Sequence, residues 1–155
     1  MQIVTRELAA QLSAEAKLNP RLRKNYNLHP SDESCCHRLL NAIEPDSYIR
    51  PHRHLDTEKD EAFILISGRL GVVTFSDDGA VTETVLLSHV SGNLAADVPH
   101  GVYHTALSLE SGTLFYETKA GPYRQLDEEE KAMWAPEDTD PQAQAFLVRL
   151  RSLFD

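Results

Sequence analysis

The sequence predicts an all-β domain, an antiparallel sandwich or barrel, with a helix at each end. Three observations favour this fold class. Short β-like runs follow one another between residues 35 and 120, turn signals separate nearly all of them, and no helical pattern interrupts them. Since parallel strands would need helical crossovers, the pattern excludes a parallel α/β architecture. We expect one structural domain, with an N-terminal segment at residues 1–34, the barrel at residues 35–120 and a C-terminal extension at residues 121–155.

The first element is a helix over residues 5–18. Apolar residues recur at helical spacing from Leu8 to Ala16, and the Thr5 hydroxyl can cap the first turn. A polar, aperiodic stretch that is crowded with hydrogen-bonding groups follows at residues 21–29. We interpret this stretch as a loop, either solvated or in contact with a ligand.

Strands make up the middle of the chain. We expect them at residues 35–43, 47–52, 62–67, 69–76, 81–87, 94–98, 102–109 and 113–119. Turns such as Asp77-Asp78-Gly79 separate them. The last element is an amphipathic helix within residues 141–154, where Phe146, Leu150 and Phe154 recur at helical spacing with arginines on the other side. It is expected to pack on the barrel or on a partner subunit.

Composition narrows the classes of function. The formal net charge is −9 and no basic stripe stands out, which argues against a nucleic-acid partner or an anionic membrane. The strongest apolar run, residues 62–66, is far shorter than a membrane span, and residues 1–10 lack the apolar core of a secretory signal, so a cytoplasmic protein is expected. Cys35 and Cys36 would point to opposite faces of a strand, which predicts two reduced thiols.

Metal-type ligands cluster in one stretch of the sequence. His52 and His54 would project from the same face of a strand, with Arg53 pointing outward, and their ring nitrogens could converge on one cation. Glu61 and His104 complete the set. Neutral imidazoles and a carboxylate suit a single divalent transition metal, Zn, Fe, Mn, Ni or Co, and leave coordination positions open for water or a substrate. The remaining histidines do not stand in such a pattern of metal-type ligands and are placed outside the site: His29, His37, His89 and His100.

The spacing of these residues resembles the two motifs of the cupin superfamily. The first motif is matched by Asp46-x5-His52-Arg53-His54 and Glu61-x6-Gly68, and the second by Gly92, Pro99-His100-Gly101-Val102-Tyr103-His104 and Ser108. Asp46 stands where glycine is usual, Ser108 stands where asparagine is usual, and one residue is added between Gly92 and Pro99. The resemblance implies a cupin-type antiparallel β-barrel or jelly roll that holds the metal through the four residues His52, His54, Glu61 and His104.

The carboxylate ligand has two candidates. The gap from His54 to Glu61 is longer than the cupin pattern expects, and Glu58 lies at the usual distance from His54. Glu61 is preferred because it lies at the expected distance from Gly68 and, by strand alternation, shares a face with apolar residues that would point into the barrel. Glu58 lies in the charged segment 56–60, which we expect to be a solvated loop.

A closer resemblance covers nearly the whole chain. Residues 23–29, 38–42, 48–54 and 117–123, together with the Trp-Ala-Pro at 134–136, resemble the WbuC-type cupin-fold metalloproteins. That small bacterial family is often encoded among surface-polysaccharide genes and lacks a firmly assigned reaction. The resemblance implies that Arg23, Asn25 and Asn27 line or cover the mouth of the cavity and bind substrate.

Two further pairs of side chains are placed by strand alternation. Tyr48 and Arg50 would share the face of the histidine pair and enter the cavity as catalytic or substrate-binding groups, with the arginine as a clamp for a carboxylate or phosphate. They could equally be a packed aromatic and a salt bridge at the barrel mouth. Glu117 and Lys119 share a face of the last strand, where a plain ion pair is expected in preference to an acid–base pair.

These expectations leave three functions open. The first is a metal-dependent enzyme that acts on a small sugar-like, carboxylated or phosphorylated molecule by isomerisation, epimerisation or lyase chemistry, in surface-polysaccharide metabolism. The second is an Fe(II) dioxygenase built on the same site. The third is a non-catalytic module in which the metal holds a small-molecule ligand. Exposed edge strands favour a homodimer.

Overall fold

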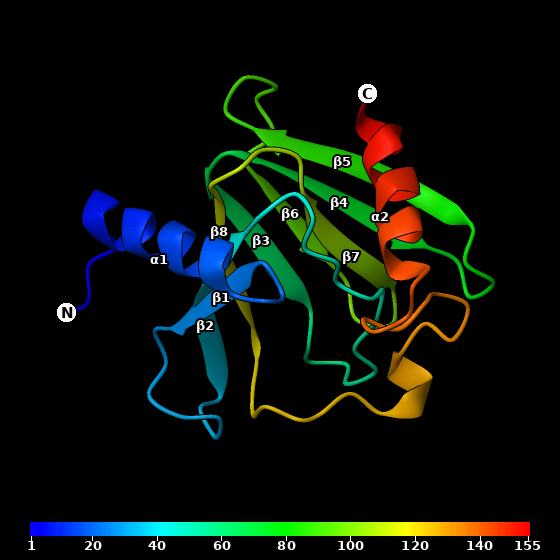
Figure 1. Cartoon of the computed structure of the whole chain (residues 1–155). Helices are drawn as coiled ribbons and strands as arrows, with labels where there is room; N and C mark the ends of the chain where they lie inside the picture. The colour runs from blue at the N-terminus through cyan, green and yellow to red at the C-terminus, as the bar shows by residue number, and fades with distance from the viewer.

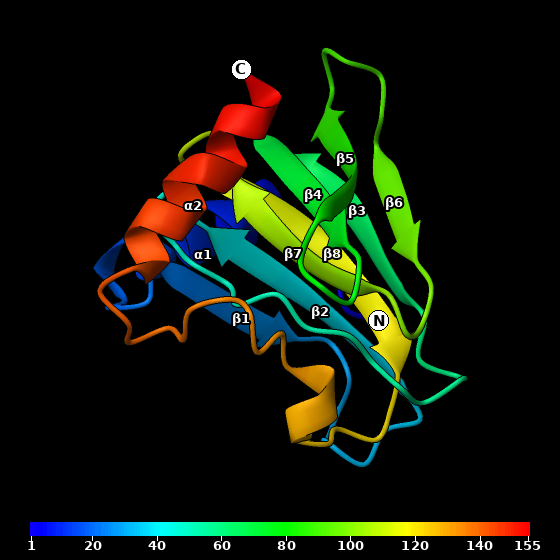
Figure 2. The ribbon, with the colours of Figure 1, turned by 90° about the vertical axis from the view of Figure 1, so that its right-hand side faces the viewer.

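Two antiparallel sheets face each other and form a cupin-type jelly roll with helices on the outside (Figure 1, Figure 2). The computed structural model describes all 155 residues. Its strands are β1 (Arg23–Asn27), β2 (Cys36–Ile43), β3 (Glu61–Ser67), β4 (Arg69–Phe75), β5 (Val81–Ser88), β6 (Ala95–Val98), β7 (Tyr103–Ser108) and β8 (Thr113–Ala120). Its helices are α1 (Arg6–Leu18) and α2 (Ala143–Arg151), with short 3₁₀ turns at Glu128–Glu130 and Ser152–Phe154. The predicted fold class is confirmed.

The sheet topology brings distant parts of the sequence side by side. The larger sheet has the order β1-β2-β8-β3-β6, and the smaller sheet has the order β5-β4-β7. Because side chains alternate across a strand, each sheet sends one set of side chains into the space between the sheets and the other set outward. The inward set forms an apolar core that includes Ile43, Phe63, Leu70, Val72, Leu87 and Phe115.

Helix α1 covers the outer face of the larger sheet. Its N-terminus is capped by Thr5, whose Oγ1 accepts a backbone N–H of the first turn at 3.2 Å. Leu12 and Ala16 are buried against Leu40 of β2 and Leu114 of β8. Full burial of a leucine contributes about 1.5–3 kcal/mol, so this contact stabilises both the helix and the sheet beneath it. The predicted N-terminal helix is confirmed.

Helix α2 and the residues before it cover the outer face of the smaller sheet (Figure 1). Phe75 of β4 and Leu107 of β7 pack in one cluster with Leu147 and Leu150 of the helix. The predicted C-terminal helix is confirmed, and its apolar side packs on the jelly roll of its own chain.

The polar segment at residues 21–29 contains strand β1, although a loop was predicted there. Its pairing with β2 runs from Arg23 opposite Ile43 to Asn27 opposite Leu39. The strand is short, polar and at the edge of the sheet, and none of its residues is buried. It therefore shows no apolar alternation, and backbone pairing with β2 determines its conformation instead.

The segment at residues 47–52 forms no regular strand, although one was predicted there. Within it, His52 alone makes isolated bridges, which connect it to His104 and Lys131. Alternation of side chains between two faces, which holds within a strand, does not hold along this segment.

Two further expectations concern the membrane and the cysteines. No helix of the structure combines the length and apolarity that a membrane crossing requires. Cys35 and Cys36 are both exposed and are not joined in a disulfide, and Cys35 lies just before β2 instead of within the strand.

Candidate metal centre and adjoining cavity

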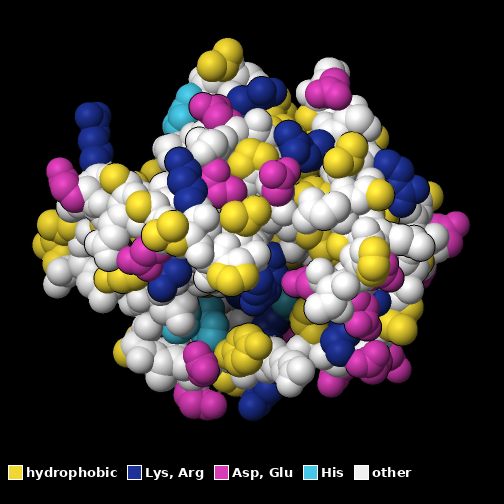
Figure 3. All heavy atoms as spheres, in the orientation of Figure 1, with side chains coloured by type: hydrophobic (Ala, Val, Ile, Leu, Met, Phe, Trp, Pro, Cys, Tyr) yellow, Lys and Arg dark blue, Asp and Glu magenta, His cyan; other side chains and the backbone are white.

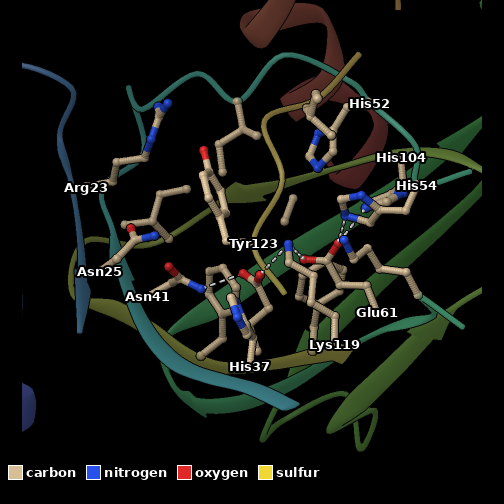
Figure 4. A pocket seen from close by; sticks show the side chains of 18 of the residues that line it. Arg23, Asn25, His37, Asn41, His52, His54, Glu61, His104, Lys119 and Tyr123 are labelled. Carbon is tan, nitrogen blue, oxygen red and sulfur yellow. Dashed lines mark hydrogen bonds and ion pairs between the residues drawn. The ribbon is translucent and has the colours of Figure 1, made fainter. Parts of the chain in front are cut away.

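Four side chains that are far apart in the sequence meet between the two sheets (Figure 4). His52 and His54 come from the irregular segment before β3, Glu61 is the first residue of β3, and His104 lies in β7. One ligand atom from each residue lies within 4.8 Å of the ligand atoms of the other three. Glu61 and His104 are only 3% and 2% exposed. The structure thus brings together all four residues that the sequence predicted as metal ligands.

Backbone hydrogen bonds hold the irregular segment against β7. His52 N donates to His104 O at 3.0 Å, and His104 N donates to His52 O at 2.8 Å. On the other side of the segment, Arg53 N donates to Glu130 O at 2.8 Å. The Arg53 side chain points outward as predicted, with its guanidinium 3.1 Å from Asp77. The segment is therefore fixed in position even though it belongs to neither sheet.

Two of the imidazole rings are oriented by backbone carbonyls. His52 Nδ1 donates to Arg50 O at 3.1 Å, and His104 Nδ1 donates to Val102 O at 2.9 Å. In both rings the Nε2 atom is left as the unprotonated nitrogen, which is the form that binds a metal. Burial, assisted by the neighbouring His104, lowers the pKa of His52 to about 3, so the His52 ring is neutral near pH 7.

The Glu61 carboxylate has different partners for its two oxygens. Oε2 lies 2.9 Å from His54 Nε2 and 3.3 Å from His104 Nε2. Oε1 accepts a hydrogen bond from Lys119 Nζ at 3.1 Å. Burial alone would raise the pKa of Glu61, but the charge of Lys119 and the contacts with the rings of His104 and His54 hold it well below its usual range. The carboxylate is therefore ionised, with Oε2 facing the imidazoles.

Polar contacts continue from Glu61 along β8. Lys119 Nζ also lies 2.9 Å from Glu117 Oε1, and Asn41 Nδ2 donates to Glu117 Oε2 at 2.6 Å. Burial and the neighbouring Glu61 raise the pKa of Glu117 to about 8. Burial would lower the pKa of Lys119, but the two carboxyl groups raise it above its ordinary value. The predicted contact between Glu117 and Lys119 is confirmed, and Lys119 contacts Glu61 as well.

The donor set fits a divalent transition metal. His52, His54 and His104 offer imidazole nitrogens and Glu61 offers one carboxylate oxygen, which are donors that Zn, Fe, Mn, Ni and Co accept. The carbonyls behind two of the rings and Lys119 behind the carboxylate are outer contacts of the kind that orient metal-binding residues. A metal held there would supply Lewis-acid chemistry toward a bound oxygen atom of a ligand.

The rival carboxylate, Glu58, lies outside this group. It is exposed in the loop before β3, and its backbone N–H donates to Asp56 Oδ1 at 3.0 Å. The structure therefore brings Glu61, and not Glu58, to the three histidines.

The ligand group lines a cavity of about 320 Å³. Figure 3 shows histidine side chains inside a hollow on this face of the molecule, with basic side chains beside them. Ile43, Ile49 and Phe63 contribute apolar wall, and Asn25 and Asn41 contribute amide groups. The charged side chains of the lining are Arg21, Arg23, Lys59, Lys119, Arg124, Glu61 and Glu117. The lining is therefore net cationic, in a chain whose formal net charge is −9.

The structure places two of the three predicted substrate-binding residues of β1 at the cavity. Arg23 and Asn25 line it, whereas Asn27 does not. The Arg23 guanidinium donates to Tyr48 O and lies 3.1 Å from Asp138 Oδ2. Much of its hydrogen-bonding capacity is thus used within the chain, where it joins β1 to the C-terminal extension.

The structure contradicts the predicted positions of Tyr48 and Arg50, because neither side chain lines the cavity. Tyr48 is 5% exposed, and its hydroxyl donates to Pro136 O at 2.8 Å. Arg50 Nη2 donates to Ala132 O at 2.9 Å. Both side chains therefore face the C-terminal extension. Placement in the cavity was wrong because it assumed strand alternation in a segment that is not a strand. The alternative of a packed aromatic and a salt bridge agrees with the structure, in which Tyr48 packs on Phe146 and Arg50 Nη1 lies 3.5 Å from Glu137 Oε1.

The cavity also contains residues that the sequence analysis placed elsewhere. Lys59 was expected in a solvated loop but is 9% exposed and lines the cavity. His37, which was placed outside the site, lines it too and stacks on His29 with ring centroids 4.1 Å apart. Tyr123 is a further lining residue (Figure 4). Of these three residues, only His37 could have been placed at the cavity from the sequence, because strand alternation puts it on the same face of β2 as Asn41, which also lines the cavity. Lys59 and Tyr123 lie in irregular segments, where alternation gives no information.

Comparison with known proteins finds one family model and a set of solved structures with a similar fold. A family model described as a domain of unknown function (DUF6016) matches residues 4–87. No curated protein matches the chain.

Protein SO0799 from Shewanella oneidensis is 17% identical over 81% of this chain and 84% of its own, with a TM-score of 0.55. TT1209 from Thermus thermophilus is 21% identical over 77% of this chain and 97% of its own, with a TM-score of 0.54. A cupin-2 domain containing protein from Shewanella frigidimarina is 18% identical over 63% of this chain and 80% of its own, with a TM-score of 0.47.

The two higher TM-scores indicate a shared fold, and identities this low say nothing about activity. The family match covers more than half of the chain and includes His52, His54 and Glu61, whereas His104 lies beyond it. The chain therefore belongs to the family described as a domain of unknown function (DUF6016), and it folds as a jelly roll of two antiparallel sheets.

Proposed function

We propose that this protein is a metal-dependent cupin that binds a small anionic molecule beside His52, His54, Glu61 and His104. One observation carries the proposal: an acidic chain encloses a cavity that combines a metal-ligand group with more cationic than anionic side chains. A concave site lined by one sign of charge concentrates ligands of the opposite sign. The ligand is therefore a carboxylated or phosphorylated compound.

The size and walls of the cavity suit a sugar-like acid. Its volume of about 320 Å³ is at the lower end of small-molecule sites. Phe63 and Ile49 offer apolar surface to a ring, while the amides of Asn25 and Asn41 offer polar contacts. The resemblance to WbuC-type cupins supports a ligand from surface-polysaccharide metabolism.

The proposed reaction is isomerisation, epimerisation or elimination on that ligand. Such reactions move a proton next to a carbonyl or hydroxyl that a Lewis acid polarises. Among the residues of the lining, Glu117 is the one carboxyl group outside the ligand set, and Tyr123 provides a phenol. These two side chains are the candidates for proton transfer to or from a bound ligand.

A second candidate function is non-catalytic binding, and one observation favours it. Both oxygens of Glu117 are already engaged, one by Lys119 Nζ and the other by Asn41 Nδ2. This carboxyl group would have to give up one of these contacts before it could exchange a proton with a ligand. In this case the metal and the cationic lining serve to retain the ligand.

Elemental analysis and mass spectrometry test the proposed function. Protein purified without chelator should contain about one transition metal per chain, and a co-purifying small molecule should carry a carboxylate or phosphate. Protein that takes up no metal from Zn, Fe, Mn, Ni or Co would refute the proposal.

Solvent exchange distinguishes the two candidates. In D2O, an isomerase, epimerase or lyase should incorporate deuterium into sugar acids or sugar phosphates, and NMR would detect the label. A binding module would retain the same compounds without exchange. Activity that requires dioxygen would instead identify an Fe(II) dioxygenase.

A further inference from the structure

Lys59 is a buried cation in the wall of the cavity. The residue is 9% exposed and lies in the loop between His54 and β3. Pro122 O, at 3.3 Å, is the one acceptor within the chain that its Nζ contacts. An ammonium group carries three donors, and burying a charge with few partners is unfavourable. Lys59 thus retains donor capacity at a position that faces the cavity.

Lys59 also lacks a carboxylate partner within the chain. Lys24, Lys119 and Lys131 each form a salt bridge, whereas Lys59 forms none. Glu130 lies in the segment that packs against this loop, but its oxygens accept the backbone N–H groups of residues 55 and 127, each at 3.0 Å. Lys59 thus forms no direct ion pair, although its charge contributes, after the backbone hydrogen bonds, to lowering the pKa of Glu130. The donors of its Nζ remain available to a ligand.

The loop that carries Lys59 is held on both sides of that residue. Lys59 N donates to Asp56 O at 3.0 Å. Asp60 Oδ1 accepts the backbone N–H and the ring Nδ1 of His100, each at 2.8 Å. Glu61, the next residue, begins β3. A lysine fixed in this way is preorganised for a ligand, because little backbone freedom remains to be lost on binding.

We propose that Lys59 receives the carboxylate or phosphate group of the molecule bound in the cavity. The inference rests on the proposed function, since it assumes that the ligand occupies the cavity beside the metal-ligand group. Hydrogen bonds between an ammonium and an anionic oxygen are roughly twice as strong as neutral ones, so Lys59 would select anionic ligands over neutral analogues. The ligand class is a small molecule with at least one carboxylate or phosphate.

Binding of inorganic phosphate and of acetate, measured by calorimetry on metal-free and on zinc-loaded protein, tests the inference. In both forms, Lys59→Gln should lower the affinity for at least one anion by about tenfold or more, because a charge-assisted hydrogen bond is lost. Lys59→Arg should retain most of the affinity. Lys17→Gln, which removes the same charge from an exposed position of α1, should leave it unchanged. Phosphate binding alone would indicate a phosphorylated ligand, and acetate binding alone a carboxylated one.

The remaining outcomes contradict either the inference about Lys59 or the proposed function. If Lys59→Gln keeps its metal and the affinities of the wild type, or if the wild type binds neither anion saturably, the inference about Lys59 is wrong. If the wild type binds no metal, the proposed function is wrong. Circular dichroism checks that the variants fold; if Lys59→Gln does not, Lys59→Met, whose unbranched side chain fills similar space, replaces it.

Discussion

Lys119 lies directly opposite Glu61 in the pairing of β3 with β8, and its ammonium donates to Glu61 Oε1 at 3.1 Å. The other oxygen, Oε2, faces the Nε2 atoms of His54 and His104. The register of the two strands therefore determines which oxygen is available to a metal. It also gives the buried carboxylate a positive partner in the metal-free protein.

Replacing Lys119 with methionine should destabilise the metal-free protein. Without the ammonium, the buried Glu61 carboxylate loses its counter-charge and Glu117 loses a hydrogen-bond donor, and breaking a fully buried ion pair costs roughly 3–5 kcal/mol. The Lys119 side chain is 20% exposed, so we expect a decrease in the free energy of unfolding of about 3 kcal/mol or less. Urea unfolding measures this change, and added zinc should recover most of it because the metal supplies positive charge at Glu61.

The matched control for Lys119 is Lys24→Met. Lys24 pairs with Glu15 at 3.0 Å, but both side chains are well exposed, so the expected change is below about 1 kcal/mol. Equal losses in the two variants would show that Lys119 does not stabilise the buried carboxylates.

Replacing His104 with alanine should remove most of the bound metal. The residue is 2% exposed, its Nδ1 is held by a carbonyl, and its Nε2 faces the other ligand atoms. Elemental analysis of the variant measures the loss. His89→Ala is the control, because His89 is exposed and contacts Ile66 O outside the site. Full metal retention in His104→Ala would remove His104 from the ligand set.

Replacing Glu61 with glutamine should weaken metal binding more than replacing Glu58 with glutamine. The first change removes a buried negative charge next to three imidazoles, whereas the second alters an exposed loop. Loss of a ligand or its charge should lower the affinity by at least tenfold in a competition assay with a coloured chelator. If Glu58→Gln weakened metal binding more than Glu61→Gln, the carboxylate ligand would be Glu58 in the loop.

The sequence predicted the strands best where one face of a strand is buried. Strands β3, β4 and β7 contribute inward apolar residues such as Phe63 and Val72, and these residues produce the alternation that marks a strand. Strand β1 lacks this signal because its residues are polar and it lies at the edge of the sheet. Pairing with β2, a contact that is distant in sequence, decides its conformation.

The candidate site was predictable to the extent that its residues lie at characteristic spacings. His52, His54 and Glu61 were found in this way, since their spacing and donor chemistry do not depend on the rest of the fold. The position of Lys59 does depend on it. A lysine in a charged loop looks solvated in the sequence, and only the packing of residue 122 and its neighbours encloses it.

Replacing Tyr48 with phenylalanine should affect stability and leave the site unchanged. Its hydroxyl donates to Pro136 O at 2.8 Å, and burial raises the pKa of this phenol above its ordinary value, so it stays protonated near pH 7. Losing one buried hydrogen bond should lower the free energy of unfolding by about 1 kcal/mol, which urea unfolding would detect. Metal content and phosphate affinity should equal those of the wild type, because the side chain lies outside the cavity. A variant of normal stability with reduced phosphate affinity would instead return Tyr48 to the ligand-binding residues and require the segment at 47–52 to change its conformation when a ligand binds.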